Sequence, residues 1–234
     1  MTRISCIIPA WNEAARIGAV LQAAANHPDL AEVIVVDDGS SDGTDRIAAA
    51  TPGVRLIRQP VNGGKTAAMV AGIAAAQAGT LMFLDADLIG LTPGAISALA
   101  RPVLAGRADV SISLRGNAPG LWQRIGLDYI SGERVMPRAL LEARGPELLR
   151  LPRFGFEVHL NRLWLAEGYR ISVVGWPGVA SPTKARKAGL WRGIQGDALM
   201  MRDIFRVLPP AQALSQIHRM RVARCAPDPD LPRD

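Results

Sequence analysis

Hydrophobic residues in the first half of the chain alternate between short continuous runs and helical spacing. Strands are predicted over residues 4–8, 33–36, 54–57, 81–84 and 109–113, and the continuous apolar run at 33–36 is typical of a buried parallel strand. The segments between them have the spacing or the end signals of helices, and they cover residues 13–26, 40–50, 63–78 and 93–104. This alternation predicts an open α/β sheet, mainly parallel, with right-handed crossovers.

The alternation weakens beyond residue 114. We expect the following elements there, in order: a loop over 115–120, a polar segment over 131–138 with a helical turn near residue 137, a helix over 155–168, a strand over 171–174, and amphipathic helices over 190–208 and 211–224. Pro209 and Pro210 separate the last two helices. The pattern favours one domain over residues 1–185, followed by basic amphipathic helices over 186–225 and a flexible tail over 226–234.

Charge divides the chain more sharply than hydropathy does. Of the 234 residues, the first 100 carry 6 Lys and Arg against 9 Asp and Glu, whereas the remainder carries 21 against 12. A basic second part suggests anionic partners such as phosphorylated substrates or a membrane surface. Arg-rich codon usage is the alternative explanation, because Lys supplies only 3 of the 27 basic residues.

Composition excludes several classes of protein. No apolar run reaches the roughly 18 residues that span a bilayer. The chain has 2 Cys, far apart, and 3 His, which argues against a zinc site or a His-based triad and for a reducing cytoplasm. Aromatic residues make up 5% and no recognition motif is present, so we expect no nucleic-acid partner.

The most chemically informative segment is Asp85-Ala86-Asp87, which directly follows a predicted strand. Side chains one residue apart on an extended chain point to the same side. Two carboxylates so placed suit Mg²⁺ or Mn²⁺, which proteins usually share with substrate phosphates. In open α/β sheets, ligands bind at this carboxyl edge of the strands.

Three further polar segments follow predicted strands. Asp37-Asp38 follows the second, where Asp38 could accept hydrogen bonds from a nucleoside; equally, both carboxylates could bind backbone N–H groups of a tight turn. Trp11 and Glu13 follow the first, and a tryptophan there could stack on a base or pack in the core. Residues 62–66 imitate a phosphate loop, but Gln59 occupies the position where the full P-loop pattern requires glycine.

In this order and spacing the four motifs closely resemble those of family 2 glycosyltransferases of the GT-A fold. In that family Pro-x-x-Asn-Glu follows the first strand, as Pro9 to Glu13 do here, and Val-Val-Asp-Asp-Gly-Ser-x-Asp-Gly-Thr is matched by Val35 to Thr44. The resemblance covers residues 3 to about 115. Residues 131–138 are similar to the Ser-Gly-x-Arg-x-x-x-Arg segment of polyprenyl-phosphate (dolichyl-phosphate-type) sugar synthases.

The resemblance implies a Rossmann-like, nucleotide-binding half over residues 1–114 and an acceptor-side half over 115–185. It implies a nucleotide site made of Pro9, Ala10, Trp11, Glu13, Asp38, Lys65, Asp85 and Ala86. Asp85 and Asp87 would hold Mg²⁺ or Mn²⁺ on the donor diphosphate.

Further roles follow for the acceptor-side half. Arg134 and Arg138 would contact a donor or acceptor phosphate. A hydroxyl acceptor would need a base, for which Glu133 and Asp128 are the candidates. Glu157 is a third candidate, but we expect it on a helix, where it orients an arginine.

We therefore expect metal-dependent transfer, with inversion, from a UDP- or GDP-sugar to a phosphorylated acceptor, with polyprenyl phosphate favoured. The alternatives are a retaining synthase acting on 3-phosphoglycerate, whose Asp-Ala-Asp-Leu pattern Leu88 completes, and a non-catalytic nucleotide-sugar-binding protein. Residues 184–224 carry 9 Lys and Arg against 2 Asp and Glu, which fits an anionic membrane surface, packing on the domain, or a homodimer contact. The expected location is the cytoplasm, with peripheral attachment to the inner membrane face.

Overall fold

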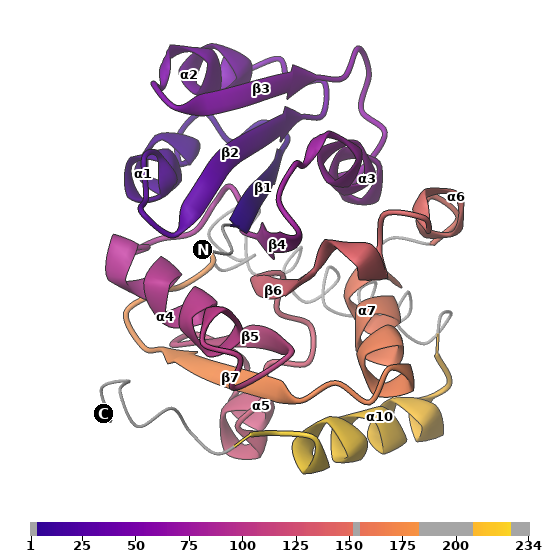
Figure 1. Ribbon diagram of the computed structural model, residues 1–234. Coiled ribbons are helices and arrows are strands. Elements are labelled where there is room, and N and C mark those ends of the chain that lie inside the picture. Colours follow the sequence, from indigo (N-terminus) through magenta and orange to yellow (C-terminus); the bar gives the residue numbers. More distant parts are fainter. Residues whose placement is uncertain (1–3, 152–154, 183–207, 226–234) are drawn as a thin grey trace, which may run out of the picture.

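The computed structural model describes residues 4–151, 155–182 and 208–225 (Figure 1). They form a seven-stranded sheet of order β3-β2-β1-β4-β6-β5-β7 with helices on both faces. The strands are β1 (Ile4–Ala10), β2 (Leu30–Asp37), β3 (Val54–Arg58), β4 (Thr80–Phe83), β5 (Val110–Arg115), β6 (Arg134–Pro137) and β7 (Ile171–Trp176). Only β6 runs antiparallel to its neighbours, so the structure confirms the mainly parallel α/β sheet.

Two layers of helices cover the sheet. The helices are α1 (Ile17–Ala24), α2 (Thr44–Ala50), α3 (Lys65–Ala75), α4 (Pro93–Leu104), α5 (Gly120–Ile125), the short 3₁₀ helix η1 (Arg138–Leu140), α6 (Gly145–Leu148), α7 (Gly155–Ala166) and α10 (Pro210–Val222). Helices α1, α2 and α4 lie on one face, and α3 and α7 on the other (Figure 1). Along β1 the side chains alternate between these layers, because Cys6 and Ile8 pack under α1 and α4 while Ile7 packs under α3.

Three short elements depart from the sequence-based expectation. The polar segment 131–138 contains β6, and helices α5 and α6 were not predicted. Strand β6 has four residues and begins at the fully buried Arg134, so its sequence lacks the apolar run by which the other strands are identified. The helical turn expected near residue 137 is η1.

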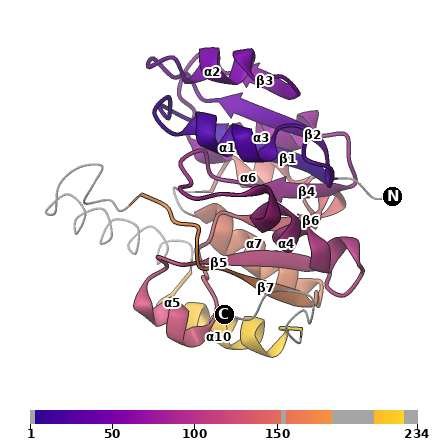
Figure 2. The same cartoon turned by 90° about the vertical axis from the view of Figure 1, so that its left-hand side faces the viewer.

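The C-terminal helix α10 packs against α7, and its Ala213 and Met220 are buried in the core shared with that helix. Figures 1 and 2 show α5 and α10 together at the end of the molecule that carries β5 and β7. The predicted helix over 211–224 is thus confirmed. The helix predicted over 190–208 lies almost entirely outside the described residues, and the tail predicted over 226–234 lies entirely outside them. Within the described parts of the chain, no helix has the length and apolar character needed to cross a membrane.

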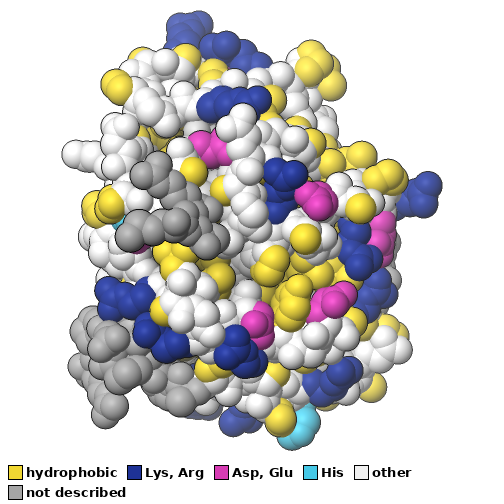
Figure 3. All heavy atoms as spheres, viewed as in Figure 1, with side chains coloured by type: hydrophobic (Ala, Val, Ile, Leu, Met, Phe, Trp, Pro, Cys, Tyr) yellow, Lys and Arg dark blue, Asp and Glu magenta, His cyan; other side chains and the backbone are white. Residues whose placement is uncertain are grey.

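Basic side chains do not gather into a single patch on the face seen in Figure 3. Among the described residues of this face, Lys and Arg are interrupted by hydrophobic and acidic side chains (Figure 3). The positive charge of the second part is therefore dispersed on this side of the molecule.

Close contact between α3 and the sheet requires a glycine at position 72. A Cβ atom on Gly72 would lie 2.5 Å from Cγ2 of Ile7 and 3.3 Å from Cγ2 of Val36, both in buried strands. We predict that Gly72→Ala lowers the free energy of unfolding by about 1–2 kcal/mol, because overpacking costs about 1–3 kcal/mol and the gain in helix propensity returns up to about 1 kcal/mol.

Urea denaturation checks this prediction, with Gly94→Ala in α4 as the matched control. A Cβ on Gly94 would meet only Oγ1 of Thr92, at 3.8 Å, so the control should be neutral or stabilising. A Gly72→Ala protein as stable as the control would contradict the packing argument.

Candidate active site

The residues predicted to bind the nucleotide and the metal line one pocket at the carboxyl edge of the sheet. The chain builds β1, β2 and β3 outward in one direction and then places β4 on the other side of β1, and this reversal is the position at which open α/β sheets bind ligands. A pocket of about 670 Å³ opens there. Its lining includes every predicted nucleotide-site residue and both predicted metal ligands: Pro9, Ala10, Trp11, Glu13, Asp38, Lys65, Asp85, Ala86 and Asp87.

Asp85 lies at the centre of the charged groups of this pocket. The ammonium Nζ of Lys65, the first residue of α3, lies 2.7 Å from Oδ1 of Asp85 and 3.3 Å from Oε1 of Glu157 on α7. Burial raises the pKa of Asp85, but Lys65 and, more distantly, Arg115 bring it below its ordinary value. For Lys65 the effects are reversed: burial lowers its pKa, and the carboxylates of Asp85 and Glu157 raise it above its ordinary value. Both groups therefore stay charged.

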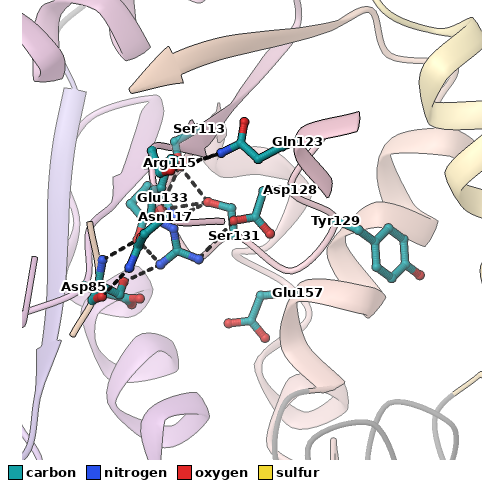
Figure 4. A network of polar contacts seen from close by, with 12 residues as sticks. Asp85, Ser113, Arg115, Asn117, Gln123, Asp128, Tyr129, Ser131, Glu133 and Glu157 are labelled. Atoms are coloured by element: carbon teal, nitrogen blue, oxygen red, sulfur yellow. Dashed lines mark hydrogen bonds and ion pairs between the residues drawn. The ribbon is translucent and has the colours of Figure 1, made fainter. Parts of the chain in front are cut away.

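The segment 131–133 packs against the far side of Asp85. A Cβ on Gly132 would lie 2.8 Å from Oδ1 of Asp85, so a larger residue at this position would displace the carboxylate. Glu133 is fully buried and accepts hydrogen bonds from the hydroxyls of Ser113 (2.7 Å) and Ser131 (2.8 Å) (Figure 4). Burial raises its pKa, Arg115 lowers it and Asp85 raises it again, so that it lies above its ordinary value.

Arg115, at the end of β5, links this network to a second carboxylate. Its guanidinium lies 3.0 Å from Oδ2 of the buried Asp128 and 3.6 Å from Oε1 of Glu133, and it donates to Oγ of Ser181 (Figure 4). Sequence reasoning missed Arg115 because the predicted strand ended at residue 113. A strand extended to the next charged residue would have placed Arg115 at the same edge as Asp85.

Of the three carboxylates considered as a base, the structure brings Glu157 into the pocket. Glu133 and Asp128 are fully buried and are not among the described residues of its lining. Glu157 is on a helix, as expected, but the side chain that it pairs with is Lys65 rather than an arginine.

Asp38 anchors the loop that leads into α3. Its Oδ1 and Oδ2 accept hydrogen bonds from the backbone N–H groups of Gly63 and Gly64, each at 2.8 Å, and Asp37 accepts one from the N–H of Ser40 at 3.2 Å. The backbone-binding alternative for both carboxylates is thus observed. Asp38 still lines the pocket, and a carboxylate has lone pairs beyond the two used here.

Trp11 provides a flat apolar surface at the mouth of the pocket. Half of its surface is exposed (50%), so it does not pack in the core, which was the alternative for this residue. An exposed aromatic ring beside a pocket can stack on a planar ligand.

Neither of the two predicted phosphate-binding arginines faces the pocket. Arg134 is 0% exposed and donates to the backbone oxygens of Ser131 (2.7 Å) and Tyr129 (3.1 Å) and to Oδ1 of Asn161 (2.6 Å). Its guanidinium also lies over the ring of Trp164, 4.9 Å from the centroid. The observed contacts make Arg134 part of the core between β6 and α7, and they do not support the expected phosphate contact.

Arg138 is carried to the opposite edge of the sheet. Because β6 is antiparallel to β4, Arg134 pairs with Phe83 near the pocket while Pro137 pairs with Thr80 at the other end. Arg138 then forms an ion pair with Glu142 at 2.9 Å and donates to the carbonyl of Ala76. The direction of β6, which the sequence did not reveal, thus separates this residue from the site.

The pocket lining also has an apolar part. It includes Leu149, Leu151 and Phe156, and Leu149 is 56% exposed. Sequence reasoning did not assign these leucines, because α6 was not predicted and an isolated leucine gives no signal of a pocket.

The chemistry of the pocket fits a divalent cation. Asp85 and Asp87 offer hard oxygen ligands from one short segment, and Asp85 already has the Lys65 ammonium beside it. The described lining carries five carboxylates (Glu13, Asp38, Asp85, Asp87, Glu157) and a single cationic side chain, Lys65. Among the described residues no group of three or more His, Cys, Asp or Glu is placed to hold a metal, so the remaining ligands would come from a bound anion and water.

Comparison with protein families identifies the architecture. The model of the family described as "Glycosyl transferase family 2" matches residues 5–159. The chain belongs to glycosyl transferase family 2. Solved structures of similar proteins have the same fold over nearly the whole chain, and the sheet is the GT-A fold that the motifs indicated.

Two kinds of curated protein are similar to this chain. Glucosyl-3-phosphoglycerate synthase of Mycobacterium tuberculosis is 35% identical over 159 residues, covering 62% of this chain and 49% of that protein. Undecaprenyl-phosphate 4-deoxy-4-formamido-L-arabinose transferase of Aeromonas hydrophila is 35% identical over 130 residues, covering 52% and 39%. This chain thus spans about half the length of the curated relatives that it matches best.

Solved structures of the first relative cover more of the chain. The M. tuberculosis glucosyl-3-phosphoglycerate synthase in complex with Mn²⁺, UDP and phosphoglyceric acid has a TM-score of 0.70 at 25% identity, covering 92% of this chain and 78% of that one. Its complex with Mg²⁺ and UDP has a TM-score of 0.69 at 25% identity, covering 93% and 80%.

The two arginines give a test of the site geometry. We predict that Arg134→Met lowers the free energy of unfolding by about 3 kcal/mol or more, because the carbonyl of Ser131 and Oδ1 of the buried Asn161 lose the donor that Arg134 supplies. Arg138→Met should cost about 1 kcal/mol or less, because its ion pair is at the surface. Urea denaturation measures both. If Arg134→Met left the free energy of unfolding unchanged and weakened nucleotide binding, the result would contradict the core role of Arg134 and support its contact with a phosphate.

Proposed function

We propose that the protein transfers a glycosyl group from a UDP-sugar to a phosphorylated acceptor, with Mg²⁺ or Mn²⁺ as cofactor. The observation that carries this proposal is the convergence of Asp85, Asp87, Lys65 and the nucleotide-side residues on one pocket. The family membership and the UDP and Mn²⁺ bound by a structural relative support the same chemistry.

The charge balance of the pocket explains the need for a divalent cation. A nucleoside diphosphate is an anion, and the described lining already has five carboxylates against one ammonium. When bound at Asp85 and Asp87, Mg²⁺ or Mn²⁺ would neutralise the diphosphate and stabilise it as a leaving group.

The protein's own side chains would orient the donor. Trp11 offers a stacking surface for the base, and Asp38 fixes the loop at residues 63–64 that forms the floor of this side. Lys65 lies close enough to the Asp-x-Asp segment to reach the diphosphate. Glu157, which lines the pocket beside Lys65, would face the sugar.

We favour polyprenyl phosphate as the acceptor. An acceptor phosphate is ionised at neutral pH and attacks without a strong base, in keeping with a lining that has no histidine among the described residues. The exposed Leu149 and its neighbours Leu151 and Phe156 suit the apolar chain of such an acceptor. A lipid acceptor would require attachment to the cytoplasmic membrane face, and we expect inversion at the anomeric carbon.

A second candidate acceptor is 3-phosphoglycerate. The likeness to glucosyl-3-phosphoglycerate synthase extends over more than nine-tenths of this chain, which favours it. An assay with UDP-glucose and each acceptor, with the anomeric configuration of the product read by NMR, separates a lipid-phosphate product from a soluble one.

Nucleotide selectivity gives the primary test. We predict that UDP raises the melting temperature only when Mn²⁺ is present, and that GDP, CDP and ADP do so less, because the metal must offset the carboxylates of the pocket. A ligand at about 100 times its Kd adds about 2.7 kcal/mol, a shift that is readily measured. If GDP stabilised the protein and UDP did not, GDP would replace UDP in the proposal. UDP binding without turnover on either acceptor would favour a non-catalytic binding protein.

The metal ligands are tested separately. We predict that Asp87→Asn abolishes the Mn²⁺-dependent part of UDP stabilisation while leaving the fold intact, since one of the two protein ligands loses its charge. Asp45→Asn is the matched control, because Asp45 pairs with Arg58 on α2 and β3, outside the described lining. Undiminished Mn²⁺ dependence in Asp87→Asn would remove Asp87 from the metal site.

A further inference from the structure

The position of Lys65 relative to the carboxylates raises a question about the order of binding. Its ammonium lies between Asp85 (2.7 Å) and Glu157 (3.3 Å), and it is the sole cationic side chain among the described residues of the lining. The ammonium of Lys65 therefore occupies one oxygen of Asp85.

A metal ion that enters alone meets two obstacles. It must displace Lys65 from Oδ1 of Asp85, and it finds no cluster of three or more protein ligands among the described residues. Two positive charges cannot share one carboxylate oxygen without strong repulsion at this distance. The diphosphate of a nucleotide removes both obstacles, because it supplies oxygen ligands for the metal and a new anionic partner for Lys65.

We propose that Lys65 acts as an internal counter-ion that suppresses binding of the free metal ion and moves from Asp85 to the donor diphosphate when the metal–nucleotide complex enters. This inference rests on the proposed function, because it requires a nucleoside diphosphate as ligand. Metal and nucleotide are then taken up together, and loading of the empty site by a divalent cation is disfavoured.

The backbone around Lys65 allows this exchange without a loop movement. The N–H groups of Gly63 and Gly64 are fixed on Asp38 at 2.8 Å each, and α3 begins at Lys65 itself. The flexible four-carbon stem of lysine is the part that can turn. Glu157, already 3.3 Å from Nζ, remains available as its second partner during the exchange.

Removal of the Lys65 charge should therefore change the affinities for Mn²⁺ alone and for UDP with Mn²⁺ in opposite directions. Lys65→Met frees Asp85, so Mn²⁺ alone should bind about tenfold tighter or more. The same substitution removes a cation from the diphosphate, so UDP with Mn²⁺ should bind about tenfold weaker or more. A variant that merely damages the fold would weaken binding of Mn²⁺ alone and of UDP with Mn²⁺. Lys65→Arg keeps the positive charge and should therefore keep both wild-type affinities.

Electron paramagnetic resonance of free Mn²⁺ measures the affinity of the protein for Mn²⁺ alone. Isothermal calorimetry at saturating Mn²⁺ measures its affinity for UDP. Both use the full chain as wild type, Lys65→Met, Lys65→Arg and Arg58→Met. Arg58 is paired with Asp45 away from the pocket, so Arg58→Met controls for the loss of one positive charge. Circular dichroism confirms that each variant is folded.

Opposite changes in Lys65→Met, absent in Arg58→Met, are the expected result. Mn²⁺ binding to Lys65→Met no tighter than to wild type, while wild type binds UDP with Mn²⁺, would overturn the counter-ion role and leave the proposed function standing. Absence of UDP binding to wild type even with Mn²⁺ would overturn both.

Discussion

The carboxylate of Asp85, directly after β4, keeps its negative charge although protein surrounds much of it. The contacts of the neighbouring residues stabilise this charge. Asp85 follows β4 at the point where β1 and β6 flank the strand, so protein encloses it on several sides. Lys65 supplies the nearest opposite charge at 2.7 Å, and the missing Cβ of Gly132 leaves room for the carboxylate. Burial of an ion is tolerated only with such partners.

The second half of the chain acts through these surroundings. The segment that leads into β6 places Gly132 and Glu133 beside Asp85, and β5 ends at Arg115, whose guanidinium forms ion pairs with the buried Asp128 and Glu133. Arg134, one residue further along, ties this strand to α7 and thereby helps to hold Glu157 in place beside Lys65. Residues that never enter the pocket thus determine the positions of those that do.

The residues on the nucleotide side of the pocket were predictable because most of them are close in sequence to the end of a predicted strand. Each of Glu13, Asp38 and Asp87 follows a strand, and parallel strands bring their carboxyl ends to one edge whatever the details of packing. The pocket contains every residue expected there. The likeness to family 2 motifs in the first half pointed to the same edge.

The acceptor side was not predictable in this way, and the reason is physical. Spacing alone suggested that Arg134 and Arg138 act together, but the antiparallel direction of β6 buries the first and carries the second to the far edge of the sheet. Strand direction depends on pairing with β4 and β5, which are distant in sequence. By itself the sequence determined the sheet, its ligand-binding edge and the carboxylates gathered there. Only the tertiary structure decided which charges meet, because contacts such as Lys65 with Glu157 join residues that no local pattern connects.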